Sequence, residues 1–308
     1  MAGEPFGRVA PRDSNALFAA ERPIDVDLFR SDEEIGHERQ CGPGPMSGEP
    51  LVLLHGVAMS ARVWDPLIPP LSAQFELLAP TALGHRGGAA VSRRPARITD
   101  FVDEVERLLD EKGWATAHLA GNSLGGWTAI ELARRGRART VCALSPAGFW
   151  DAGGNGHADS SATIARNVTF ARLTRPLAPL TLRSSLVRRL ALRVIAEHGD
   201  RLESSAAHGI VADLLGCTVT DDLLGTKDAI ADFERLPCPI TVAWSQADRI
   251  FPVAVNGEIA KQRLPDATFE VLPGVGHVPM IDDPELVLRT ILTGTGASPG
   301  QAGVSGTN

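Results

Sequence analysis

A serine, an aspartate and a histidine each follow an apolar segment that has the pattern of a buried strand. Ser123 lies in the stretch GNSLG, Asp248 follows PITVAWS and His277 follows TFEVLPG. Because the carboxyl ends of parallel strands meet at one edge of a sheet, we expect these three side chains to lie close together. A serine hydroxyl becomes a strong nucleophile when an imidazole removes its proton and a third group orients that imidazole. The three residues therefore indicate attack on a carbonyl carbon.

The stretch around Ser123 has two interpretations. In a G-x-S-x-G motif the serine occupies a strained strand-to-helix turn, where its hydroxyl is exposed at a helix N-terminus. Serine is also a favoured N-cap residue, so the motif can equally describe an ordinary helix cap in a tight turn. The spacing of the other two residues favours the first interpretation.

The elements that must position these residues alternate along the chain. The sequence predicts strands at 51–56, 75–80, 115–121, 140–146, 238–245 and 267–274, and helices at 99–112, 123–136 and 284–292. Strands that alternate with helices across short connections pair in parallel and carry helices on both faces of the sheet.

The strand series is interrupted once. Residues 147–236 contain helical patterns at 161–175, 181–198, 204–215 and 222–235. We therefore expect an irregular arm with an edge strand (1–45), the first half of an α/β core (46–146), a helical cap (147–236), the second half of the core (237–294) and a disordered tail (295–308).

Four spaced motifs give the chain a recognisable pattern: HG at 55–56, GNSLGG at 121–126, SQADRIFP around Asp248 and GVGHVPM around His277. In this order they resemble the α/β-hydrolase fold superfamily, in its cap-bearing branch of serine esterases. The resemblance covers about residues 50–292. It implies a mostly parallel sheet of eight strands flanked by helices, with the helical cap inserted between the sixth and seventh strands.

The resemblance also assigns roles. It makes Ser123 the nucleophile, His277 the general base and then acid, and Asp248 the residue that orients the imidazole. The backbone N–H groups of Val57 and Leu124 would form the oxyanion hole. This scheme needs neither a metal nor an organic cofactor.

The implied activity is hydrolysis of a carboxylic ester with a small or medium apolar acyl group, through an acyl-enzyme. An alternative is a carbon–carbon bond hydrolase of ring-opened aromatic products, although Val57-Ala58-Met59 and Val278 depart from the pattern of that branch. The epoxide-hydrolase branch uses an aspartate nucleophile and cap tyrosines, whereas this chain has Ser123 and no tyrosine. A third hypothesis is a family member that binds a ligand without catalysis.

Composition narrows the class of protein further. The net charge of −7 argues against nucleic-acid binding, which needs a basic surface. No stretch reaches the length of about 18 apolar residues that spans a membrane, and the first fifteen residues lack an apolar segment, so we expect a cytoplasmic protein. The four cysteines have no metal-site spacing and are expected to be reduced. A small-molecule ester is the expected partner, and no oligomeric state is predicted.

Several charged residues carry weaker hypotheses. His55 is interpreted as a structural residue below its loop, His85 as a turn residue, and Asp213 as a cap residue that could touch substrate. Between Ser160 and Ile195 the chain has seven arginines and no acidic residue. This segment is either a set of helices with solvated guanidinium groups or a surface that attracts an anionic substrate or a membrane.

Overall fold

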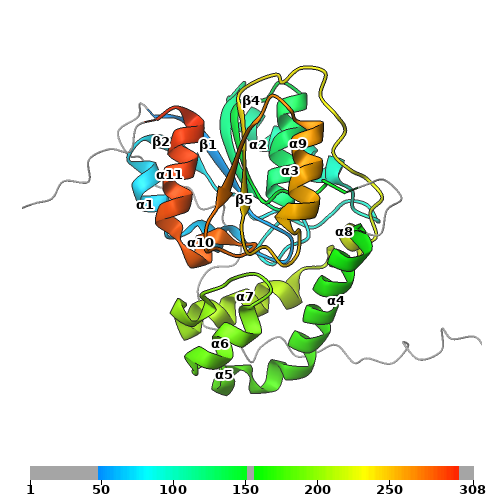
Figure 1. The fold of residues 1–308 in the computed structure, drawn as a ribbon, viewed down its shortest axis with the longest axis vertical. Helices are drawn as coiled ribbons and strands as arrows, with labels where there is room; N and C mark the ends of the chain where they lie inside the picture. The colour runs from blue at the N-terminus through cyan, green and yellow to red at the C-terminus, as the bar shows by residue number, and fades with distance from the viewer. Residues whose placement is uncertain (1–47, 151–155, 298–308) are drawn as a thin grey trace, which may run out of the picture. The chain divides into compact units, whose positions relative to one another are not determined.

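A computed structural model describes residues 48–150 and 156–297. The predicted arm (1–45) and residues 298–308 of the predicted tail lie outside the described residues. The core is a six-stranded sheet of order β2-β1-β3-β4-β5-β6 in which every neighbouring pair is parallel (Figure 1). The strands are β1 (Glu49–Leu54), β2 (Phe75–Leu78), β3 (Ala117–Asn122), β4 (Ala138–Leu144), β5 (Ile240–Ser245) and β6 (Thr268–Leu272).

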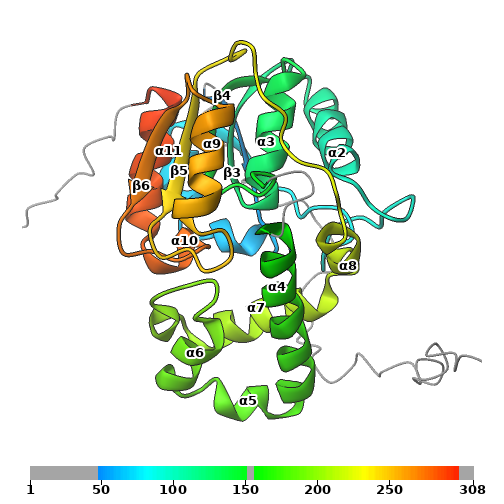
Figure 2. The same cartoon turned by 45° about the vertical axis from the view of Figure 1, so that its right-hand side comes forward.

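Helices cover both faces of this sheet (Figure 2). One apolar core lies between the sheet and α2 (Ile98–Glu111), α3 (Leu124–Arg134) and α9 (Glu258–Arg263). The other lies between the sheet and α1 (Ile68–Ser72), α10 (Pro279–Asp282) and α11 (Pro284–Thr295), together with the short 3-10 helix η2 (Ala61–Trp64).

Residues 51–54 of strand β1 illustrate why a buried strand is apolar at successive positions. Leu51 and Leu53 pack into the second core, and Val52 and Leu54 pack into the first. Successive side chains of a strand point to opposite faces, so a strand between two helical layers needs an apolar residue at each position. The mostly parallel, helix-flanked sheet predicted from the sequence is confirmed.

The predicted number of eight strands is not confirmed, because the described residues contain six. Each of the six strand segments that the sequence predicts within the described residues forms a strand. The count of eight included edge strands in the arm, which lies outside the described residues.

The described residues between β4 and β5 form helices and no strand. We refer to them as the intervening helices: α4 (Gly156–Thr174), η3 (Arg175–Leu177), α5 (Ala178–Thr181), α6 (Ser185–Leu192), η4 (Gly199–Arg201), α7 (Ser204–Gly216) and α8 (Thr220–Leu224). Helix α4 packs against α7. None of the described helices combines the length and apolar character needed to cross a bilayer.

The helix predicted at 222–235 is wrong beyond its first residues, because α8 ends at Leu224. The backbone of Ile230 explains the difference. Its N–H donates to Gly148 O and its carbonyl accepts a hydrogen bond from Arg263, while its side chain is buried in the core. Tertiary partners thus replace the hydrogen bonds that a helix would supply.

The strand order reverses direction at β1. The chain passes from β1 to β2 on one side and then returns to form β3 on the other side of β1. Such a reversal leaves a crevice at the carboxyl ends of the two central strands. The loops after β1 and β3, which carry Val57 and Ser123, begin at this crevice.

Candidate active site

Ser123 has an unusual backbone conformation, with φ 56° and ψ −115°. This region is unfavourable for a residue with a Cβ, and such strain persists where the surrounding structure imposes it. Two glycines allow the tight turn. A Cβ on Gly121 would come within 2.2 Å of Gly125 O, and a Cβ on Gly125 would come within 2.1 Å of Leu54 O.

The hydroxyl of Ser123 does not cap the helix that follows. Ser123 occupies the N-cap position of α3, but its side chain accepts no hydrogen bond from the first turn. Its backbone is fixed instead, because its N–H donates to Leu144 O at 3.0 Å and its carbonyl accepts from Trp127 and Ala147. The helix-cap interpretation therefore does not explain this serine.

Asp248 and His277, which are far apart in the sequence, form a buried pair. The distance from His277 Nδ1 to Asp248 Oδ2 is 2.7 Å, and both side chains are almost completely excluded from solvent. Asp248 Oδ1 accepts hydrogen bonds from the backbone N–H groups of Ile250 and Phe251, each at 2.8 Å. A carboxylate held by three hydrogen bonds fixes the orientation of the imidazole and leaves Nε2 as its other nitrogen.

Asn122 joins the serine turn to the histidine loop. Its Nδ2 donates to His277 O at 2.9 Å and to Leu144 O at 3.1 Å, and the residue is completely buried. Because Asn122 immediately precedes Ser123, this contact brings the loops after β3 and β6 together. This residue was not predicted from the sequence, since an asparagine that bonds distant carbonyl groups leaves no spacing pattern.

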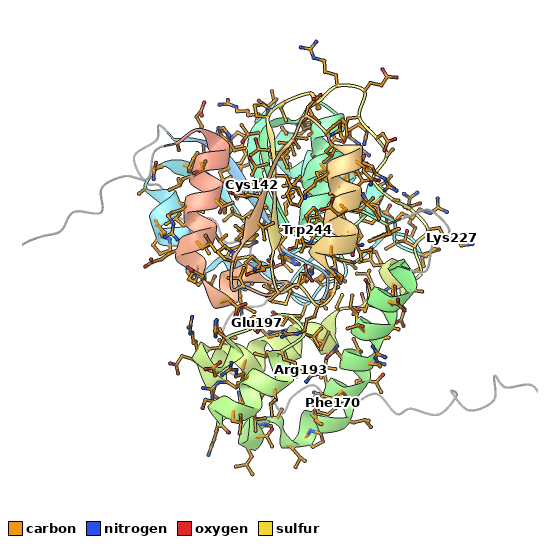
Figure 3. The ribbon with its side chains drawn as sticks, viewed as in Figure 1. Cys142, Phe170, Arg193, Glu197, Lys227 and Trp244 are labelled. Atoms are coloured by element: carbon orange, nitrogen blue, oxygen red, sulfur yellow. The ribbon has the colours of Figure 1, made fainter. Side chains whose placement is uncertain are left out.

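Asp282 fixes the same histidine loop from the other side. Its carboxylate accepts from the N–H of Gly276 at 2.7 Å, of Glu197 at 2.9 Å and of His198 at 2.6 Å. Glu197, labelled in Figure 3, follows α6 in the chain. This buried carboxylate therefore connects the residue before His277 to the intervening helices. It was also missed from the sequence.

The two predicted amide donors lie beside the serine turn. The N–H of Leu124 opens α3 immediately after Ser123, and Val57 follows Gly56, where an added Cβ would lie 3.1 Å from Ser123 Cβ. Among the described residues, neither N–H has a hydrogen-bond partner. Both groups are thus available to a ligand.

His55 supports the loop that carries Val57. Its Nδ1 lies 2.8 Å from Gly56 O, and its Nε2 accepts from the N–H of Ala82 at 2.9 Å, so Nδ1 carries the proton. Burial, reinforced by the neighbouring imidazole of His85, lowers the pKa of His55 to about 3. This neutral ring is a structural element, as expected from the sequence.

An apolar cavity of about 420 Å³ connects the predicted residues to the intervening helices. Ser123, His277 and Val57 line one part of it, and side chains of α4, α5, α6 and α7 line the rest. A cavity of this size and apolar character suits the hydrocarbon part of a small molecule. Ser123 is 3% exposed, so a substrate must enter a cavity to reach it, and this one is much larger than the cavity of about 40 Å³ that Ser123 also lines.

Other predicted residues have structural partners. Asp213 does not line this cavity but accepts from Ser60 Oγ at 2.6 Å and from Arg86 Nε at 2.8 Å. The ring of His85 packs edge-on against His55. Among the described cysteines, Cys142, Cys217 and Cys238 are free thiols. In the described part of the chain, no group of three or more His, Cys, Asp or Glu side chains is placed to hold a metal ion.

Comparison with known proteins identifies the family. A family model described as "Alpha/beta hydrolase family" matches residues 51–290. The chain belongs to the alpha/beta hydrolase family. Epoxide hydrolase EphH of Mycobacterium tuberculosis is 34% identical over 195 residues, which cover 62% of this chain and 91% of that protein.

Two further matches concern one relative, the carboxylesterase YbfK of Bacillus subtilis. Its sequence is 32% identical over 127 residues, which cover 41% of this alpha/beta hydrolase and 43% of YbfK. Its crystal structure superposes with a TM-score of 0.61 at 21% identity and covers 82% of this chain and 85% of that one. The structural match shows the shared fold, and the family shows that the chain is a hydrolase of the alpha/beta type.

Proposed function

We propose that this hydrolase cleaves carboxylic esters with apolar acyl groups, with Ser123 as nucleophile, His277 as general base and acid, and Asp248 as the residue that orients His277. The observation that carries the proposal is the buried 2.7 Å contact between His277 and Asp248, next to a strained serine that lines the same cavity as His277. An imidazole with its Nδ1 held by a carboxylate presents Nε2 to a hydroxyl, which is the arrangement that activates serine.

The reaction proceeds in two halves. His277 Nε2 removes the Ser123 proton as Oγ forms a bond to the ester carbon, and the carbonyl electrons move to its oxygen. When the carbonyl reforms, the bond to the alkoxy oxygen breaks, and that oxygen leaves as an alcohol with the proton from His277. Water then attacks the acyl-serine with the same base, and the acid and free Ser123 are released.

The N–H groups of Val57 and Leu124 would stabilise the negative oxygen in both halves. Donors that are already oriented toward the developing charge contribute on the order of 3 kcal/mol each in comparable sites. The intervening helices, in the segment 147–236, would act as the cap that supplies the apolar wall for the acyl chain. The aliphatic character of that wall supports an apolar acyl group.

Epoxide opening is the second activity to test, because a 34% identical relative is named an epoxide hydrolase. An opened epoxide leaves an alkoxide that needs a proton donor, and this chain contains no tyrosine to provide a phenol. Carbon–carbon cleavage of a vinylogous 1,5-diketone would use the same serine and histidine, and it is the alternative to ester hydrolysis. Non-catalytic ligand binding would leave the buried Asp248–His277 pair without a use.

Turnover of a substrate panel tests the proposal. We expect the wild type to hydrolyse p-nitrophenyl butyrate faster than styrene oxide or a vinylogous diketone, and Ser123→Ala to lower kcat by about a thousandfold or more. Ser72→Ala is the matched control, because Ser72 ends α1 and bonds only to Pro69 O. Faster turnover of the epoxide or the diketone, or full ester turnover by Ser123→Ala, would refute ester hydrolysis by this serine.

A further inference from the structure

The intervening helices expose an unusual amount of apolar surface. Six large apolar side chains between residues 170 and 190 are 58 to 76% exposed, whereas the rest of the described chain exposes only Val255 and Val271 to a comparable degree. We call the six the apolar face; they are Phe170, Leu173, Leu177, Leu180, Leu186 and Leu190. A concentration of exposed large apolar side chains of this kind indicates a contact with another molecule or a membrane.

The cavity that contains Ser123 opens within this face. Phe170, Leu177 and Leu190 are among the exposed residues and also line the cavity wall. Leu173, Leu180 and Leu186 do not line the cavity, but they are exposed on the same helices, α4, α5 and α6. The route from solvent to the serine therefore passes through the apolar face.

Positive charge accompanies the apolar face. Arg172, Arg183 and Arg193 are exposed and, among the described residues, form no ion pair. Figure 3 labels Phe170 on α4 and Arg193 just after α6, both within the intervening helices. The segment from Ser160 to Ile195 has no acidic residue, in a chain whose net charge is −7. The protein thus concentrates uncompensated guanidinium groups where it also exposes leucine.

We propose that the apolar face docks onto the surface of an anionic phospholipid bilayer, and that the ester substrate enters the cavity directly from that surface. Leucine and phenylalanine side chains insert at the acyl boundary, while guanidinium groups pair with the phosphate groups of the lipids. The route to Ser123 rests on the ester hydrolysis proposed above, whereas the docking itself does not.

The position of the cavity mouth favours a membrane over a protein partner. A second copy of the chain or another protein seated on the apolar face would cover Phe170, Leu177 and Leu190, which line the cavity, and would block this route to Ser123. A fluid lipid surface would instead continue the apolar lining of the cavity. A second copy would also bring the arginines of its own segment 160–195 against this face, whereas an anionic lipid layer presents negative charge to them.

Flotation of the protein with lipid vesicles tests the docking independently of catalysis. We use ether-linked lipids, which the enzyme cannot hydrolyse, with either an equal mixture of phosphatidylglycerol and phosphatidylcholine or phosphatidylcholine alone. We expect binding to the anionic vesicles to exceed binding to the neutral vesicles at least about tenfold, and to weaken as salt screens the arginines.

Two sets of three substitutions separate the contribution of the apolar side chains to vesicle binding from that of the arginines. Leu173→Ser, Leu180→Ser and Leu186→Ser together should lower vesicle binding at least about tenfold, because the inserted apolar area is lost. Arg172→Gln, Arg183→Gln and Arg193→Gln together should remove the preference for anionic lipid. Val255→Ser with Val271→Ser is the matched control and should bind as the wild type. Thermal unfolding and circular dichroism verify that each variant is folded.

The possible outcomes are distinct. Equal binding to both vesicle types, or wild-type binding by the folded leucine variant, overturns the proposal. A lipid-free dimer that the leucine variant converts to a monomer would show that the face binds a second copy instead. Because Ser123→Ala should float like the wild type, a failure of ester hydrolysis and a failure of docking are read from different measurements.

Discussion

At the scale of single residues, Asn122 is the residue whose role follows most directly from its contacts. Its side-chain amide holds the carbonyl of His277 and the carbonyl of Leu144, so it fixes the distance between the histidine loop and the serine turn. Both acceptors are backbone carbonyl groups rather than the side chains of Ser123, Asp248 or His277. We therefore regard it as a positioning residue.

Asn122→Ala should lower kcat for a p-nitrophenyl ester about tenfold or more, because a small displacement of His277 takes it out of line with Ser123. KM should stay nearly unchanged, because the apolar cavity wall formed by the intervening helices is not altered. Asn167→Ala is the control. Asn167 lines the same cavity, and its Nδ2 bonds only within α4, to Thr163 O. This variant should alter KM rather than kcat. The reverse pattern, with KM changed by Asn122→Ala and kcat retained, would contradict the positioning role.

The sequence indicated the residues that we propose act through their own chemistry and missed those that act through backbone contacts. Ser123, Asp248 and His277 each follow an apolar strand and belong to a local motif, so their positions could be predicted. Asn122 and Asp282 bond to backbone groups that are distant in the sequence. Nothing in a residue's neighbours reveals such partners, because they depend on how the loops pack.

At the scale of elements, a buried carboxylate fastens α7 to the core. Asp213 is 4% exposed and binds Ser60, which precedes η2, and Arg86, which lies in the loop after β2. The helical pattern predicted α7 itself. The pattern could not reveal that Asp213 faces the core loops, because the sequence of a helix does not show which neighbouring loops its buried face will contact.

Asp213→Ala should lower the free energy of unfolding by about 1–3 kcal/mol, because it leaves the buried hydroxyl of Ser60 without its acceptor. Arg86 is 41% exposed at its side chain and can turn to solvent, so its loss of a partner contributes less. Urea unfolding measures the change. Asp266→Ala, at an exposed carboxylate before β6, is the control and should change stability little. Equal effects of the two substitutions would contradict the fastening role.

At the scale of the whole molecule, stability should depend on pH through His55. The folded protein holds this ring neutral, with a pKa of about 3, whereas the unfolded chain binds the proton near 6.5. The unfolded state thus binds more protons between these values, so stability is full above about pH 6.5 and decreases as the pH falls toward 3. One such group contributes up to about 1.4 kcal/mol per pH unit.

His55→Gln should make this dependence shallower. Glutamine does not titrate. The slope of the unfolding free energy against pH between about 6 and 4 should therefore decrease by up to about 1.4 kcal/mol per pH unit, which corresponds to one bound proton. Urea midpoints of the wild type and the variant over this pH range measure the difference. Parallel curves for the two proteins would show that His55 titrates alike in the folded and unfolded chains, contrary to its burial.

The intervening helices also separate the two halves of the site along the chain. Ser123 belongs to the part synthesised before these helices, and Asp248 and His277 belong to the part synthesised after them. A growing polypeptide therefore acquires the proposed nucleophile long before the proposed base. Under the proposed mechanism, a chain released early from the ribosome would carry an unactivated hydroxyl, and hydrolysis would begin only after translation of the last two strands.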